Sequence, residues 1–192
     1  MGAESEIKVG CCGFVVSQKE YFTLFNLIEI QNTFYQIPRL QTAERWRGTA
    51  PRDFEFTMKA WQLITHEPSS PTYRRLKGKI EPMKSDRYGR FRATPEVMDA
   101  WRCTAMFART LGVSIVVFQC PASFRPQYGE FQYFRLHDIT GYDYRYTDVD
   151  LQGLRKWVDK RPTYLLFNNN WMKDDALRFI DLVQREKRGH RT

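Results

Sequence analysis

The chain has 192 residues, of which 42% are hydrophobic and 15% aromatic, and this composition excludes a disordered protein and suits a single domain, residues 1–192, with a sizeable core. No apolar run approaches the roughly 18 residues of a membrane span, so we expect a soluble protein without a membrane partner. Thirty Lys and Arg against 22 Asp and Glu give a formal charge of +8, whose field attracts polyanions and anionic substrates.

Six short apolar runs predict strands along the chain. They lie at residues 7–13, 27–31, 54–60, 113–119, 131–137 and 163–168. Helix signals stand between most of them. Ser17 with Glu20 is a capping box after the first strand, and Thr147 with Asp150 is another after the fifth.

The longest predicted helix begins at Thr94, which is followed by a proline and an acid, and Gly112 ends it. A shorter helical segment from Thr42 links the second and third strands, and apolar residues at helical spacing predict a last helix around Phe179. Residues 61–93 break this alternation as a long polar excursion with three prolines. Such a connection is often functional, and a surface excursion packed over the rim of a barrel explains it equally well.

The alternation of strands and helices predicts a parallel sheet with right-handed crossovers. An open doubly wound sheet and a closed (β/α) barrel both fit this order. No GxGxxG or GxxxxGK[ST] motif follows any strand, which disfavours the nucleotide-binding forms of the open sheet.

The four cysteines, at positions 11, 12, 103 and 120, form no CxxC pair, which favours reduced thiols over a disulfide framework. With three histidines and no HExxH motif we expect neither a metal centre nor a cofactor, although a site formed by Cys12 and Cys120 stays an alternative. The first ten residues show no signal-peptide pattern, so we expect a cytoplasmic location.

Polar residues follow most of the predicted strands at their carboxyl ends, where ligands bind in both architectures. Because polar groups are costly to bury without partners, their repeated use at one end indicates a wet, convergent site. We expect Lys59 to act in catalysis, His137 to be an acid-base group, and Glu29 to be a general base or to orient His137. The expected substrate-binding residues are Arg135, Gln31, Thr65, His66, Gln119, Asn168 and Asn169. A buried ion pair of Glu29 with Lys59 and a core histidine at position 137 stay the structural alternatives.

Several stretches resemble a known family in its own order. They are VGCCGF, IEIQNTFYQIPRLQTAERWRGTAPRDFEFTMKAWQLITH, SPTYRRLK, VVFQCPASFRP, FRLHDITGYDYRYTDVDL and YLLFNNNWMKDDALRF. On them the chain resembles the YecE-like family, also called domain of unknown function 72, and in particular its archaeal branch. The resemblance implies a (β/α) barrel related to the eight-stranded type and no known reaction. It marks as characteristic Glu29, Phe34, Tyr35, Lys59, Thr65, His66, Arg135, His137, Asn168 and Asn169, and thereby adds Tyr35 to the expected substrate-binding residues.

The chain departs from the family at one place. Members carry a segment with two more strands between the stretches matched by QCPASF and YFRLH, and here only RPQYGEFQ joins them, an apparent deletion between Phe124 and Phe134. We therefore expect an α/β, TIM-barrel-like fold that is incomplete, with about six parallel strands. The gap would be covered by the excursion or by a second copy in a homo-oligomer, or left open as a groove.

The first functional hypothesis is an enzyme acting on a phosphorylated or polyanionic substrate, nucleic acid included, with Arg135 and Lys59 holding phosphate. The second is a non-catalytic nucleic-acid or ribonucleoprotein binder with a basic surface. Its expected phosphate contacts are Arg74, Arg75, Lys77 and Lys79 together with Arg87, Arg90 and Arg92, and the rings available for stacking are Tyr73, Tyr88 and Phe91.

The absence of two strands favours the binder, because the loss of part of a barrel harms catalysis more than it harms a basic surface. A degenerate barrel that serves as a protein-interaction module is a third possibility. The expected partner is a phosphate-bearing small molecule or a nucleic acid, and the sequence leaves open whether the protein is an enzyme.

Overall fold

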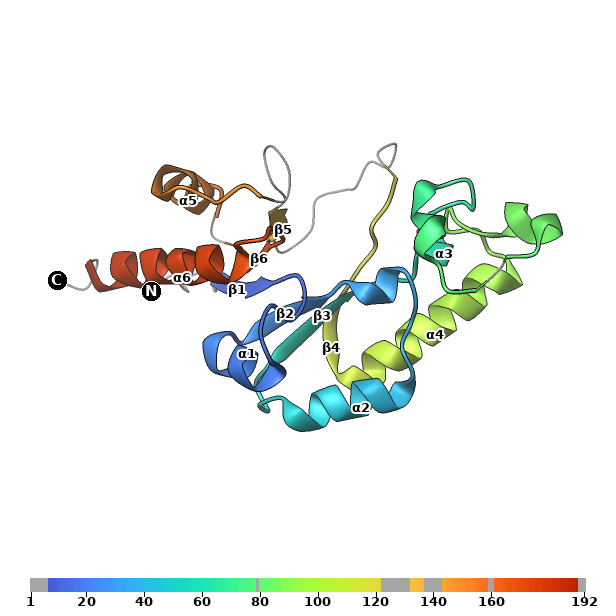
Figure 1. Cartoon of the computed structure of the whole chain (residues 1–192), viewed down its shortest axis with the longest axis horizontal. Helices are drawn as coiled ribbons and strands as arrows, with labels where there is room; N and C mark the ends of the chain where they lie inside the picture. The colour runs from blue at the N-terminus through green and yellow to red at the C-terminus, as the bar shows by residue number, and fades with distance from the viewer. Residues whose placement is uncertain (1–6, 79, 122–131, 137–142, 159–160, 190–192) are drawn as a thin grey trace. The chain divides into compact units, whose positions relative to one another are not determined.

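The computed structural model describes residues 7–78, 80–121, 132–136, 143–158 and 161–189 (Figure 1). In this part of the chain six strands form one sheet in the order β4-β3-β2-β1-β6-β5. The strands are β1 Ile7–Cys11, β2 Leu27–Ile30, β3 Glu55–Lys59, β4 Val113–Val117, β5 Gln132–Leu136 and β6 Thr163–Phe167. Each falls inside a predicted apolar run, and the sequence prediction of an incomplete TIM-barrel-like α/β fold with six parallel strands is confirmed.

Helices alternate with the strands as the capping signals predict. The α-helices are α1 Gln18–Leu24, α2 Leu40–Thr49, α3 Gln62–Thr65, α4 Pro95–Leu111, α5 Asp148–Arg155 and α6 Met172–Gly189, and the 3-10 helices are η1 Asn32–Phe34, η2 Pro71–Arg75 and η3 Pro82–Arg87. The Thr94 hydroxyl caps α4, and Gly112 ends it in a left-handed conformation with φ of 71°. Thr147 and Asp150 form the predicted reciprocal box at the start of α5. No helix of the described residues is both long enough and apolar enough to span a membrane.

The chain divides into two compact units. Unit 1 comprises residues 1–29 and 127–192, and in it β1 pairs in parallel with both β2 and β6, and β6 with β5. Helix α6 packs against β1 and β6 (Figure 1). Tyr21 ties α1 to the sheet, since its hydroxyl donates to the Leu27 carbonyl and accepts from the Cys11 amide, both at 2.9 Å. The packing of α6 on the sheet and the buried hydrogen bonds of Tyr21 stabilise the core of unit 1.

Unit 2 comprises residues 30–126, and in it β3 and β4 form a parallel pair. Helices α2 and α4 lie side by side on these strands (Figure 1). The polar excursion is also packed, because its short helices cover a buried cluster at the start of α4. That cluster contains Ala60, Leu63, Ile64, Val97 and Ala100, with Trp61, Tyr73, Leu76, Ile80 and Tyr88 against it. The excursion is therefore an ordered part of unit 2 that packs on its hydrophobic core.

Candidate functional site

The candidate residues of unit 1 centre on a buried carboxylate. Glu29, in β2, is fully buried, and its Oε1 lies 2.9 Å from Nε of Arg135 in β5. The Tyr133 hydroxyl donates to its other oxygen at 2.9 Å. Burial alone would lower the pKa of Arg135, but the charge of Glu29 and the neighbouring Cys12 raise it. The structure thus brings Glu29 and Arg135 together as a charged pair, and Tyr133 is a member of this group that the sequence did not mark.

The two asparagines at the end of β6 are placed by other contacts. The buried Asn169 donates from Nδ2 to Asp175 at 2.7 Å and to the Tyr144 carbonyl at 2.8 Å. Arg178 donates to the same aspartate at 3.0 Å. The network fixes the start of α6 to the segment before α5. Asn168 is also buried, and its backbone N–H donates to the Leu136 carbonyl.

Two expected site residues, His137 and Lys79, lie outside the described residues. The roles of His137 in acid-base catalysis and of Lys79 in binding nucleic acid stay predictions.

The candidate residues of unit 2 gather where β3 and β4 end. The Lys59 side chain is buried, and its ammonium lies 5.2 Å from the centre of the Phe34 ring and donates to Gln119 Oε1. The hydroxyl of Thr33 donates to the Lys59 carbonyl at 2.7 Å and so fixes η1 against β3. Gln31 stands just before η1, and its carbonyl accepts from the Phe34 amide. Strand ends and η1 together hold the buried Lys59 ammonium near the Phe34 ring and against the Gln119 side chain.

His66 belongs to the same group. Its Nδ1 lies 2.8 Å from the Thr65 hydroxyl, and its ring meets Phe34 edge to face at a centroid distance of 5.2 Å. Burial lowers the pKa of His66, and the positive charge of Lys59 lowers it further. The imidazole is therefore neutral at pH 7 and can accept a proton. The sequence predicted Lys59, Thr65 and His66 as neighbours, and the structure brings them together in unit 2.

A basic pocket opens elsewhere on unit 2, with a volume of about 530 Å³. It is lined by Asn32, Tyr35, Gln36, Pro38, Arg39, Arg75 and Lys77. The Arg75 guanidinium lies 4.0 Å from the centre of the Tyr35 ring, and its Nη1 donates to the Tyr35 hydroxyl at 3.0 Å. The lining contains three cations and no carboxylate among the described residues.

Sequence reasoning anticipated part of the basic pocket. It marked Tyr35, Arg75 and Lys77 but missed Arg39, because this arginine follows no strand end and is not among the positions that the family resemblance marks as characteristic. Arg74 is exposed beside Arg75. Tyr73 instead faces inward, and its hydroxyl donates to the His66 carbonyl at 2.7 Å.

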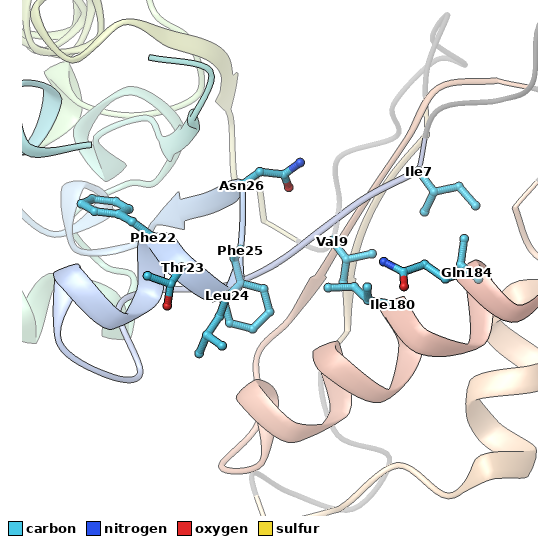
Figure 2. A pocket seen from close by; sticks show the side chains of 10 residues that line it. Ile7, Val9, Phe22, Thr23, Leu24, Phe25, Asn26, Ile180 and Gln184 are labelled. Atoms are coloured by element: carbon cyan, nitrogen blue, oxygen red, sulfur yellow. The ribbon is translucent and has the colours of Figure 1, made fainter. Parts of the chain in front are cut away.

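A further pocket, in unit 1, has a volume of about 490 Å³ and lies at the amino end of β1 (Figure 2). Figure 2 shows Leu24 and Phe25 on one side and Val9, Ile180 and Gln184 on the other. Its described lining has no titratable side chain, so it offers no group for acid-base chemistry.

The described residues contain no cluster of three His, Cys, Asp or Glu side chains suited to a metal ion. Cys12 packs in the core of unit 1 against Leu27 and Leu166. Burial raises the pKa of Cys120, whose Sγ lies 3.5 Å from the Phe118 carbonyl oxygen. The Cys120 thiol is therefore a poor source of thiolate.

The fold and these groups define an α/β protein of the incomplete TIM-barrel type with a cation-rich pocket. The chain belongs to the family described as protein of unknown function DUF72, whose model matches residues 17–134. This confirms the family that the sequence resembled, while the archaeal branch and the deletion stay predictions. No protein with a curated description matches the chain.

Solved structures of the same family resemble the chain. One is a DUF72 family protein from Enterococcus faecalis V583, with a TM-score of 0.57 and 18% identity, covering 94% of this chain and 98% of that one. Another structure of that protein has a TM-score of 0.52 and 16% identity, covering 93% and 94%. A DUF72 family protein from Thermotoga maritima MSB8 has a TM-score of 0.49 and 19% identity, covering 93% and 99%. At these identities the Enterococcus structures support the fold alone.

Proposed function

We propose that the protein binds a phosphate-bearing polyanion in the basic pocket of unit 2. The observation that carries the proposal is the lining: Arg39, Arg75 and Lys77 surround a hollow in which no described carboxylate opposes them. All three side chains belong to exposed residues, so a ligand reaches them from solvent. Arginine matches phosphate geometry with paired N–H donors, and lysine adds a compact charge.

The distribution of charge along the chain supports the same region. Residues 30–126, which make up unit 2, carry 16 Lys and Arg against 8 Asp and Glu, whereas the residues of unit 1 carry 14 of each. The whole formal excess of the protein therefore belongs to unit 2. A polyanion is drawn toward such a region over distances longer than any single contact.

The geometry at Arg75 also favours binding. Stacking on Tyr35 holds the guanidinium plane, and the hydrogen bond to the Tyr35 hydroxyl uses Nη1. A guanidinium has five N–H groups, so further donors remain for phosphate oxygens. Because the group is already oriented, less side-chain entropy is lost when the ligand binds.

The proposal is tested by fluorescence anisotropy with a labelled single-stranded oligonucleotide at several salt concentrations. Arg75→Gln should weaken binding and reduce the slope of log K against log salt by about 0.7, the loss of one phosphate contact. Tyr35→Phe, which keeps the ring under Arg75, should bind almost as the wild type does. Arg185→Gln removes an exposed cation of unit 1 and is the matched control. The proposal is contradicted if the wild type binds with an affinity that does not depend on salt. It is also contradicted if the Arg75 and Arg185 variants lose affinity equally.

A second candidate function, hydrolysis of the bound polyanion, is favoured by the group at the end of β3. His66 can accept a proton beside the positive charge of Lys59. The buried Gln62, the first residue of α3, has no hydrogen-bond partner for either side-chain polar atom within the described structure. If this group is catalytic, the oligonucleotide recovered from the binding experiment is shortened by the wild type and intact with His66→Gln. An intact oligonucleotide after incubation with the wild type leaves binding as the function.

A further inference from the structure

Three aromatic side chains of unit 2 form an exposed surface outside the basic pocket. Phe91, Trp101 and Phe118 are 47%, 37% and 38% exposed. The Phe118 ring centre lies 5.4 Å from that of Phe91 and 5.7 Å from that of Trp101. We define these three residues as the aromatic platform. Contiguous exposed apolar surface is uncommon on soluble proteins and marks sites of interaction.

The backbone holds Phe91 in this exposed position. Arg90 and Phe91 have φ of 53° and 54°, in the left-handed region that residues other than glycine rarely adopt. Their amides donate to the carbonyls of Thr65 and Ile64, at 3.2 and 2.9 Å. The turn is thus fixed to α3, the helix that directly follows β3. A conformation of this kind persists only where the surrounding structure enforces it.

Positive charge lies beside the platform. Arg90 precedes Phe91, and its side chain is 68% exposed. Arg90 and Arg92 both pair with Glu67, at 2.7 and 3.0 Å, so two guanidinium groups share one carboxylate. The remaining charge and the unused N–H groups of Arg90 suit an anion next to the rings. An apolar partner surface would not use this charge.

We propose that the aromatic platform stacks the bases of single-stranded nucleic acid. The inference rests on the proposed function and names its ligand class. In the basic pocket Arg75 covers a face of the Tyr35 ring, so that pocket suits phosphates rather than bases. The Phe118 ring is tilted by 53° from the Phe91 ring and by 33° from the Trp101 ring. Because the rings are not coplanar, each offers its own surface to a separate base. Bases in a duplex are already stacked, whereas those of a single strand are available.

The test compares two labelled oligomers with equal numbers of phosphates, each of about 12 nucleotides. One is oligothymidylate, and the other has the same backbone with abasic sugars. The wild type should bind oligothymidylate about tenfold more tightly. Trp101→Ala and Phe91→Ala should each lower the affinity for oligothymidylate to that for the abasic oligomer. Neither change should alter the affinity for the abasic oligomer. Trp101→Phe should keep most of the wild-type preference for oligothymidylate.

Trp157→Ala is the matched control, because Trp157 is an exposed tryptophan of unit 1. Equal binding of both oligomers by the wild type overturns the inference and leaves the proposed function standing. Binding of neither oligomer removes the proposed function itself. If the platform variants keep their preference for bases but lose self-association in light scattering, the platform is a protein interface and the inference fails.

Discussion

At the scale of single residues, the most specific consequence of the structure is the coupling between Lys59 and His66. Burial and the Lys59 charge both lower the pKa of the imidazole. Lys59→Met removes the charge, so the pKa of His66 should rise toward its ordinary value of 6.5. Proton NMR titration of the ring measures it, with His66→Gln to assign the signal and Lys173→Met as a control from unit 1. An unchanged or lower pKa in the Lys59 variant contradicts the coupling.

The same shift affects stability. Below pH 6.5 the unfolded chain takes up a proton on this histidine before the folded chain does, because the folded-state pKa is lower. The free energy of unfolding therefore falls as the pH drops from 6.5 through the folded-state pKa. Lys59→Met should narrow the pH range over which stability falls, because it brings the folded-state pKa of His66 closer to 6.5.

Which residues could be predicted depended on their position. Lys59, Thr65 and His66 were expected together, because all three stand at or just after the carboxyl end of one predicted strand, where parallel sheets bind their ligands. Glu29 and Arg135 follow from the same rule, and their pairing with each other was not anticipated. Arg39 and Phe118 were missed as members of surface sites, because a pocket or platform built from distant segments leaves no local pattern.

At the scale of elements, the left-handed turn at residues 89–91 gives a prediction about stability. Gly89 has φ of 77°, and a Cβ there would lie 2.4 Å from the His66 carbonyl oxygen. Gly89→Ala should lower the free energy of unfolding by about 1–2 kcal/mol for the backbone conformation and about 1–3 kcal/mol for the clash. Urea denaturation measures the change. Gly153→Ala, in α5 with open space around it, should instead stabilise by up to about 1 kcal/mol. An unchanged midpoint for Gly89→Ala contradicts this account.

Elements with local signals were predictable, and those made by packing were not. Strands follow from apolar runs, and α4 and α5 follow from capping residues such as Thr94 and Thr147. Inside the excursion the sequence indicated only polarity and prolines. Its helices α3, η2 and η3 are held by aromatic side chains, such as Tyr73 and Tyr88, that pack on a cluster reaching into α4. Such long-range contacts leave no periodicity in the segment itself.

At the scale of the whole molecule, the net charge does not show how unevenly the charged residues are distributed along the chain. A formal charge of +8 over 192 residues suggests a diffuse field, yet residues 30–126 carry all of the excess and the rest of the chain is balanced. This could not be derived from total composition, because it depends on where unit 2 begins and ends. The basic pocket and the aromatic platform both belong to that unit.

Two triple variants with the same net charge separate local binding from overall attraction. One changes Arg39, Arg75 and Lys77 to glutamine, and the other changes the exposed Lys19, Lys156 and Arg185. If the pocket makes three phosphate contacts, the first variant should lose about 2 from the slope of log K against log salt for a single-stranded oligonucleotide. The second should stay close to the wild type, because its cations belong to the balanced unit and line no part of the pocket. Equal losses in both variants would mean that net charge alone attracts the polyanion, and the pocket would then have no specific part in binding.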